Sequence, residues 1–112
     1  MKLSDFLLKD INLKYGKILY LDIDIDIEKK FEEQQWSYKE DMLQIGFGEN
    51  YIIDIGWSPD HEKKGNFILL VVKDFNWYEP IVEKKIKTFI DLKKNLENEI
   101  NTLELLFLQN KQ

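Results

Sequence analysis

The sequence of 112 residues contains no cysteine, no arginine and no alanine, and it has a single histidine. Without cysteine, the chain has no disulfide, no thiol nucleophile and no cysteine-ligated metal, and this composition fits a reducing cytoplasm. Without arginine, it lacks the planar group that binds phosphate or guanine through two parallel hydrogen bonds. The net charge is −5. Because phosphate neutralisation supplies most of the affinity for nucleic acids, we expect no nucleic-acid partner.

Long apolar runs are also missing. The longest runs from Phe67 to Val72, which suits a buried strand and is far shorter than the roughly 20 residues that a membrane-spanning helix needs. The residues after Met1 lack the apolar segment and cleavage site of a secretory signal. We therefore predict one cytoplasmic domain spanning residues 1–112, with no membrane partner. Its core would be built from the 44% of residues that are apolar.

Acidic residues are concentrated in one part of the chain. Residues 22–62 contain twelve aspartates and glutamates against three lysines, so this segment carries a charge of −9 and the remainder carries +4. Such asymmetry can steer a basic partner towards the protein. A solvated acidic surface that binds nothing explains the asymmetry equally well.

Hydrophobic periodicity predicts the first two elements. Residues 3–13 place leucines and Ile11 on one helical face, with Ser4 as a candidate cap. Residues 18–28 alternate strictly between apolar and polar side chains. This alternation predicts a strand with leucines and isoleucines on its buried face and acids on its wet face.

The middle of the chain predicts further strands. Residues 40–47 and 50–57 alternate on either side of turn-forming residues and are expected to form a hairpin. Residues 67–73 are apolar on both faces, which favours a central strand, and residues 81–86 form a short final strand. All the connections are short enough for an antiparallel meander.

A long helix is predicted from Thr88, where Thr88-x-x-Asp91 resembles a capping box. One apolar stripe runs along it and comprises Phe89, Leu92, Leu96, Ile100, Leu103 and Phe107. Three more leucines lie off the stripe, at 105, 106 and 108. We favour their packing against the N-terminal helix over their forming a partner or dimer surface. The predicted fold class is α+β, an antiparallel meander of about five strands with both helices packed on one face.

No set of residues indicates catalysis, and we predict a protein that is not an enzyme and uses no cofactor or metal. His61 is flanked by charged residues, as is typical of a solvated loop histidine. The D-x-D-x-D pattern of residues 22–26 matches the start of a calcium-binding EF-hand loop, and Glu33 falls at its twelfth position. However, Ile27 stands where that loop requires glycine. A strand also spaces these carboxylates by about 7 Å, too far apart for one closed site.

The acidic strand is instead predicted to bind a partner. Three like charges in a row repel one another, and a basic partner would relieve that repulsion. Tryptophan is enriched in interface hot spots, and we expect Trp36 to be the most exposed tryptophan and Trp57 to be at least partly buried. The predicted partner-binding residues are Asp22, Asp24, Asp26, Glu28, Trp36, Tyr38, Asp60 and Glu62.

Residues 51–95 also carry a recognisable pattern. A hairpin strand contains a D-x-G-W motif at residues 54–57, and a V-x-K-D-x-x-W-x-x-P segment follows at residues 71–80, before the terminal helix. In order and spacing, this half of the chain resembles small bacterial immunity proteins of polymorphic and contact-dependent toxin systems. The resemblance implies a cytoplasmic protein that binds a cognate toxin domain and blocks it. It carries over no functional residues, because the matching positions are interpreted as structural.

Two functions follow from these observations. The first is an immunity protein that neutralises a cognate toxin domain, which would be basic and could be a nuclease, through an acidic surface. The alternative is a non-catalytic interaction or regulatory domain. Under either interpretation, the protein is expected to be a monomer or a weak homodimer.

Overall fold

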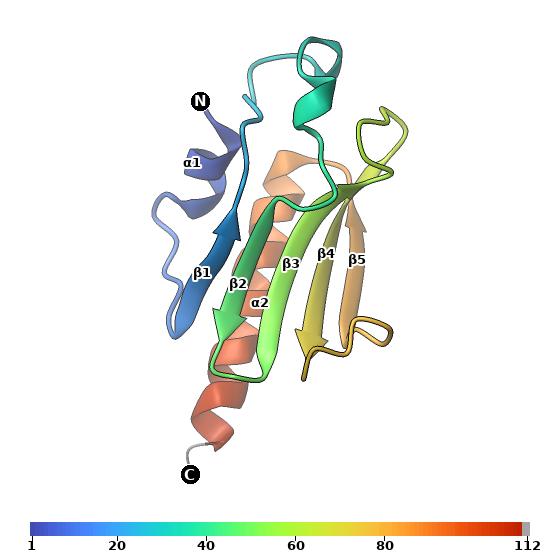
Figure 1. Cartoon of the computed structure of the whole chain (residues 1–112). Coiled ribbons are helices and arrows are strands. Elements are labelled where there is room, and N and C mark those ends of the chain that lie inside the picture. The colour runs from blue at the N-terminus through green and yellow to red at the C-terminus, as the bar shows by residue number, and fades with distance from the viewer. Residues whose placement is uncertain (111–112) are drawn as a thin grey trace.

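Five strands form one antiparallel sheet in the computed structural model, which describes residues 1–110 (Figure 1). The strands lie in sequence order, so the predicted α+β meander is confirmed. Their bounds are β1 (Gly16–Leu21), β2 (Leu43–Phe47), β3 (Tyr51–Ser58), β4 (Asn66–Lys73) and β5 (Val82–Ile86). The most apolar strand, β4, is an interior strand as predicted, with β3 and β5 paired on its two sides, but it is not the middle strand. In a five-strand meander the third strand is central, so β4 lies one place nearer the edge.

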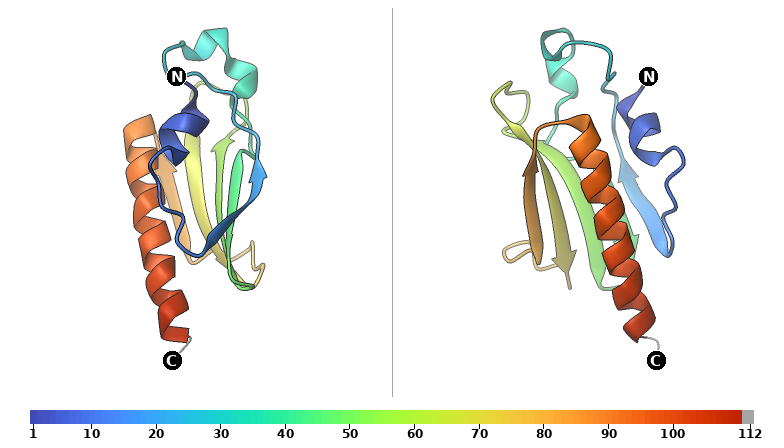
Figure 2. Two further views of the ribbon diagram at one scale, coloured as in Figure 1. Left: turned by 90° about the vertical axis from the view of Figure 1, so that its left-hand side faces the viewer. Right: turned by 180° about the vertical axis from the view of Figure 1, so that it is seen from behind.

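Two helices, α1 (Leu3–Leu8) and α2 (Phe89–Asn110), cover one face of this sheet and leave the other without a helix (Figure 2). Two short 3₁₀ helices, η1 (Phe31–Glu33) and η2 (Gln35–Ser37), lie beyond one end of the sheet. The predicted start of α2 is confirmed, because the backbone N–H of Asp91 donates to Thr88 Oγ1 at 3.1 Å. Within residues 1–110, neither α-helix is long and apolar enough to cross a membrane.

The hydrophobic core lies between the sheet and the helices. Every second side chain of β2, β3 and β4 points towards α2, because successive side chains of a strand alternate between its faces. The apolar stripe of α2 meets them, as its spacing of three and four residues predicts. Fully buried members from the sheet and from α2 are Leu43, Ile45, Ile53, Ile55, Leu69, Leu92 and Leu96.

The first helix is shorter than predicted. It ends at Leu8 rather than continuing to residue 13, and Ser4 lies inside it instead of capping it. Lys9 is extended and Asp10 has a φ of 62°, so the chain leaves the helix there and turns towards β1. Lys93 of α2 joins α1 to this turn, since its Nζ donates to the carbonyl oxygens of Phe6 at 2.6 Å and of Lys9 at 3.3 Å.

The strand predicted over residues 18–28 ends at Leu21. Leu21 pairs with Leu43, the first residue of β2. One more backbone hydrogen bond follows, from the N–H of Asp22 to the carbonyl oxygen of Met42 at 2.8 Å, and the pairing with this part of the chain then ends. Within β1, a bulge between Ile18 and Tyr20 breaks the predicted alternation. Leu19 and Leu21 are exposed rather than buried, and so are their neighbours Ile18 and Tyr20, so neither face of this strand is buried at residues 17–21.

The residues after β1 pack on α1 instead of on the sheet. Ile25 is fully buried, and its carbonyl oxygen accepts a hydrogen bond from the backbone N–H of Leu3 at 2.8 Å. Ile23 and Ile27 pack against the same core. The alternation therefore predicted correctly that these isoleucines are buried or partly buried, but they are buried partly against a helix.

The far end of α2 extends beyond the sheet (Figure 1). Leu105 is 62% exposed and Leu108 is also exposed, so the prediction that they pack within the molecule is wrong. Leu106 is partly buried against the core, as predicted. Phe107 stacks on Tyr15, with their ring centroids 4.3 Å apart. The side chains of Leu105 and Leu108 lie on the side of α2 that faces away from the sheet.

Candidate partner-binding site

The face of the sheet opposite the helices is open, and strand pairing assembles polar residues on it. Gln44 pairs with Asp54, Asp54 with Leu70, and Leu70 with Glu83. These four residues therefore form one row across β2, β3, β4 and β5. Directly opposed side chains in such a row lie about 5 Å apart. The row brings two carboxylates from distant parts of the sequence to either side of an apolar residue.

A second row beside it contains Gly56, Ile68 and Lys85. Gly56 is required here because a Cβ atom would overlap the carbonyl oxygen of Glu40. The chain before β2 crosses β3 at this point, and the backbone N–H of Trp57 donates to the carbonyl oxygen of Lys39 at 2.7 Å. This crossing places Glu40 and its neighbour Asp41 at the rim of the open face.

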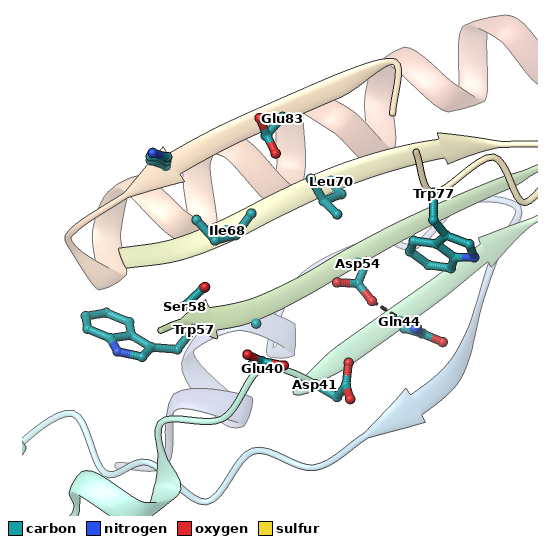
Figure 3. Close-up of a pocket in the computed structure, with 12 residues that line it drawn as sticks. Glu40, Asp41, Gln44, Asp54, Trp57, Ser58, Ile68, Leu70, Trp77 and Glu83 are labelled. Carbon is teal, nitrogen blue, oxygen red and sulfur yellow. Dashed lines mark hydrogen bonds between the residues drawn. The ribbon is translucent and has the colours of Figure 1, made fainter. Parts of the chain in front are cut away.

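The loop between β4 and β5 brings Trp77 to the same surface. Two consecutive residues, Asp74 and Phe75, have φ values of 55° and 59°, and this left-handed pair turns the chain sharply. The backbone N–H of Asp74 donates to the carbonyl oxygen of Asn50 at 2.7 Å. Trp77 lines the same hollow as Asp54 and Gln44 (Figure 3). Trp77 remains 41% exposed.

Together these elements form a groove of about 650 Å³ on the open face (Figure 3). Its floor is apolar, with Ile68 and Leu70, and four carboxylates stand around it with one lysine. The charged residues that line the groove are Glu40, Asp41, Asp54, Glu83 and Lys85. Carboxylates beside an aromatic ring and apolar floor suit a ligand that combines a cationic group with a hydrocarbon stem.

Asp54 is the most unusual of these residues. It is only 9% exposed, although it carries a carboxylate in the middle of an apolar strand. Its Oδ2 accepts one hydrogen bond, at 2.8 Å, from Nε2 of Gln44. Within residues 1–110, no cation pairs with it. Burial raises the pKa of Asp54 above its ordinary value; the Gln44 hydrogen bond opposes this effect and the charge of Asp41 adds to it.

The four acids predicted to form an interface strand lie elsewhere, and each lies beside a cation of the same chain, with two acids sharing each cation. Nζ of Lys39 lies 2.9 Å from Asp22 and 3.6 Å from Asp24, and its hydrogen bond lowers the pKa of Asp22. The N-terminal ammonium lies 3.5 Å from Asp26 and 3.3 Å from Glu28. A hydrogen bond from the backbone N–H of Glu28 is the main cause of a lowered pKa at Asp26.

The reason for predicting a partner-binding role for these acids therefore no longer holds. The prediction rested on an uncompensated row of like charges along one strand face. Residues 22–28 lie outside the sheet strands, and each of their four carboxylates lies beside a cation of the same chain, two acids to each cation.

The aromatic predictions had mixed outcomes. Trp36 is 72% exposed and Trp57 is buried, as predicted. Tyr38, predicted at the partner surface, is instead 6% exposed and packs in the core, with its ring centroid 4.8 Å from that of Trp57. The chain turns inward after η2 to reach β2, and this turn buries the Tyr38 ring.

Trp36 and Asp60 come together around His61. The Trp36 and His61 rings lie edge to face at 5.1 Å, and Nε2 of His61 lies 3.4 Å from Asp60 Oδ2. Glu62 is exposed next to them, and its carbonyl oxygen accepts a hydrogen bond from Nε1 of Trp57 at 2.8 Å. These residues form a second exposed patch, near the 3₁₀ helices and the β3–β4 loop.

Sequence reasoning missed the groove, although one signal pointed to it. An aspartate at position 54 interrupts an otherwise apolar strand, and such a residue rarely becomes buried without a role. The motif positions interpreted as structural, Asp54, Gly56 and Trp77, all line the groove. The other lining residues come from segments that only the tertiary fold brings together.

Neither similarity to known proteins nor a metal-binding cluster indicates what the groove does. Comparisons with protein-family models, curated proteins and solved structures found no match for this chain. Among residues 1–110, no three histidine, aspartate or glutamate side chains are grouped so that they could hold a metal ion. The groove is therefore interpreted through its own geometry and charge.

Proposed function

We propose that this chain is an immunity protein that binds a basic toxin domain through the open face of its sheet and blocks it. The groove carries the proposal, because it combines an unpaired buried carboxylate with an apolar floor and an exposed tryptophan. A buried carboxylate without a counter-ion destabilises the free protein, and a cationic partner relieves this destabilisation. The resemblance of residues 51–95 to immunity proteins supplies the class of partner.

Charge supports the same partner. Three of the four carboxylates that line the groove belong to the acidic segment 22–62, and Glu83 adds a fourth. A negative surface speeds the encounter with a positively charged protein and repels nucleic acid. Toxins that act on nucleic acids need a basic surface to bind their substrate, so an acidic inhibitor can occupy that surface.

Co-expression tests the proposal. The chain would be produced with the toxin domain encoded beside it in its native genome, and both cell survival and copurification would be measured. The proposal expects survival and a stable complex. As a control, a variant with Asp41→Lys and Glu83→Lys in the groove should restore killing while remaining folded. Killing in the presence of the folded wild-type chain would contradict the proposal.

A second candidate function, a homodimeric interaction domain, is favoured by exposed leucines. Leu105 and Leu108 are exposed on α2, and Leu19 and Leu21 are exposed on β1, an edge strand of the sheet. Unpaired edges and apolar surface promote self-association. Sedimentation over a range of concentrations separates the two candidates, because the immunity function requires no dimer.

A further inference from the structure

We infer that the groove on the open face receives a single lysine or arginine side chain of the partner protein, with Asp54 as its counter-ion and Trp77 as its aromatic wall. The inference rests on the proposed function only in taking the partner to be a protein. It specifies which chemical group of that partner enters the groove and which residues recognise it.

Asp54 provides the first step. Its Oδ2 is occupied by Gln44, and no hydrogen bond to its Oδ1 is formed within residues 1–110. The only buried side-chain polar atom without a hydrogen-bond partner in that range is Nδ1 of His61. Oδ1 of Asp54 is therefore not fully buried, and it is accessible from the groove. A donor that enters the groove can bind it.

The charge of that donor follows from the surroundings of Asp54. A mostly buried carboxylate without a counter-ion is destabilised, and an incoming cation relieves this by pairing with it. Asp41 and Glu83 add negative potential at the same groove, whereas Lys85 is its single cationic residue. Within residues 1–110, Lys85 forms no ion pair that would neutralise one of these acids. A neutral or anionic group would gain less than a cation.

The shape of the groove selects a long side chain. Asp54 and Glu83 are separated by Leu70 in one row of the sheet, with Ile68 in the next row. A lysine or arginine side chain can lay its methylene stem on this apolar floor while its charged end reaches Asp54. Figure 3 shows Trp77 on the side of Asp54 and Gln44, where its ring can face the charged end.

Blocked peptides test the assignment on the whole chain. The ¹⁵N-labelled protein would be titrated with acetyl-Gly-Arg-Gly-amide, its lysine analogue and its glutamine analogue. We expect the arginine and lysine peptides to shift the indole N–H signal of Trp77 and the side-chain amide signals of Gln44. The glutamine peptide should leave them unchanged.

Two matched substitutions sharpen the test. Asp54→Asn keeps the size of the side chain and should weaken binding of the cationic peptides at least about tenfold. Asp22→Asn removes a carboxylate outside the groove and should leave the affinity unchanged. Lys85→Met should increase it. Equal affinity of the wild type and the Asp54→Asn variant, or shifts that avoid Trp77 and Gln44, would overturn the inference.

Two further outcomes separate the inference from the function. If spermidine binds the groove more tightly than the arginine peptide, the groove serves a small polyamine and not a protein side chain. If the toxin domain binds wild type and Asp54→Asn equally well, the inference fails and the immunity function stands. If the peptides bind as expected but toxin still kills, the groove assignment stands and the immunity function fails.

Discussion

Asp54 shows how one residue can lower stability and still be retained. Its carboxylate lies on the open face between two isoleucines that point into the core, so strand alternation alone fixes its direction. An asparagine or serine there would avoid the cost of burying a charge. A residue that destabilises the free fold in this way is expected where binding requires it.

The substitution Asp54→Asn is predicted to stabilise the free protein at neutral pH by roughly 1 kcal/mol. Burial raises the pKa of Asp54 in the folded chain above its ordinary value of 3.8, so the folded state binds the proton more tightly than the unfolded state. The carboxylate therefore lowers stability as the pH rises from about 3.8 through the folded pKa. Urea unfolding should show the advantage of the variant growing over that range and vanishing in acid.

Asp22 supplies a control with the opposite sign. Lys39 lowers the pKa of Asp22, so its ionised form favours the folded state, and this contribution is lost as the pH falls through the folded pKa. At neutral pH, the Asp22→Asn variant should therefore be no more stable than the wild type. If both variants changed stability with pH in the same direction, the account of Asp54 would be wrong.

Gly56 tests the crossing of the chain over β3. We predict that Gly56→Ala destabilises the protein by about 3 kcal/mol or more, because the new Cβ would overlap backbone atoms of Glu40 that cannot move without breaking the crossing. Gly46→Ala is the matched control on the same face. The three atoms nearest to its Cβ would all belong to the side chain of Leu19, which is exposed and can rotate. Thermal unfolding of both variants measures the contrast, and equal losses would argue against it.

At the scale of elements, α2 follows its sequence closely, whereas β1 does not. The apolar stripe of α2 needs only one flat apolar surface, and β2, β3 and β4 supply it. A strand needs a neighbour for its backbone as well as the correct alternation. Beyond Leu21 the pairing with the chain before β2 ends after the hydrogen bond from the backbone N–H of Asp22 to the carbonyl oxygen of Met42, and the alternating residues that follow pack against α1 instead.

Shortening a leucine side chain to alanine should have different effects on the two sides of α2. Leu96→Ala, in the buried stripe, is expected to cost about 2–5 kcal/mol of stability, because it leaves a cavity against the sheet. Leu105→Ala, on the exposed side, should change stability by no more than about 0.5 kcal/mol. Chemical denaturation measures both. A large loss at Leu105 would mean that this residue is covered, as in a dimer.

At the scale of the whole molecule, the distribution of charge compensation matters more than net charge. The acids of residues 22–28 are paired with Lys39 and the N-terminus, whereas Asp54 in the groove has no cation beside it. Paired charges contribute little to the field felt by a partner, and unpaired ones contribute most. We therefore expect the groove to contribute more than residues 22–28 to the attraction of the proposed basic partner.

Two variants that each remove three negative charges test this distribution. Glu40→Gln, Asp41→Asn and Glu83→Gln neutralise the groove rim; Asp22→Asn, Asp24→Asn and Asp26→Asn neutralise the paired acids. Stopped-flow association with the toxin domain, measured from low to high ionic strength, should lose most of its salt dependence in the rim variant. A larger loss in the other variant would return the interface to residues 22–28.

The sequence by itself determined the order and type of the elements. Periods of two and of three to four residues reflect local backbone geometry, and these patterns indicated all five strands and both helices. The acid at position 54 of an apolar strand was a signal that the sequence contained, but the sequence did not show that Asp54 and Trp77 share a site.

Only the tertiary structure decided which acids are compensated and which are brought together. Lys39 reaches Asp22, and Glu83 joins the row of Asp54, through contacts between residues that are far apart in the chain. Strand register, the crossing at Gly56 and the loop carrying Trp77 create these contacts. The groove depends on all three, because burial and charge pairing are properties of neighbours in space and not in sequence.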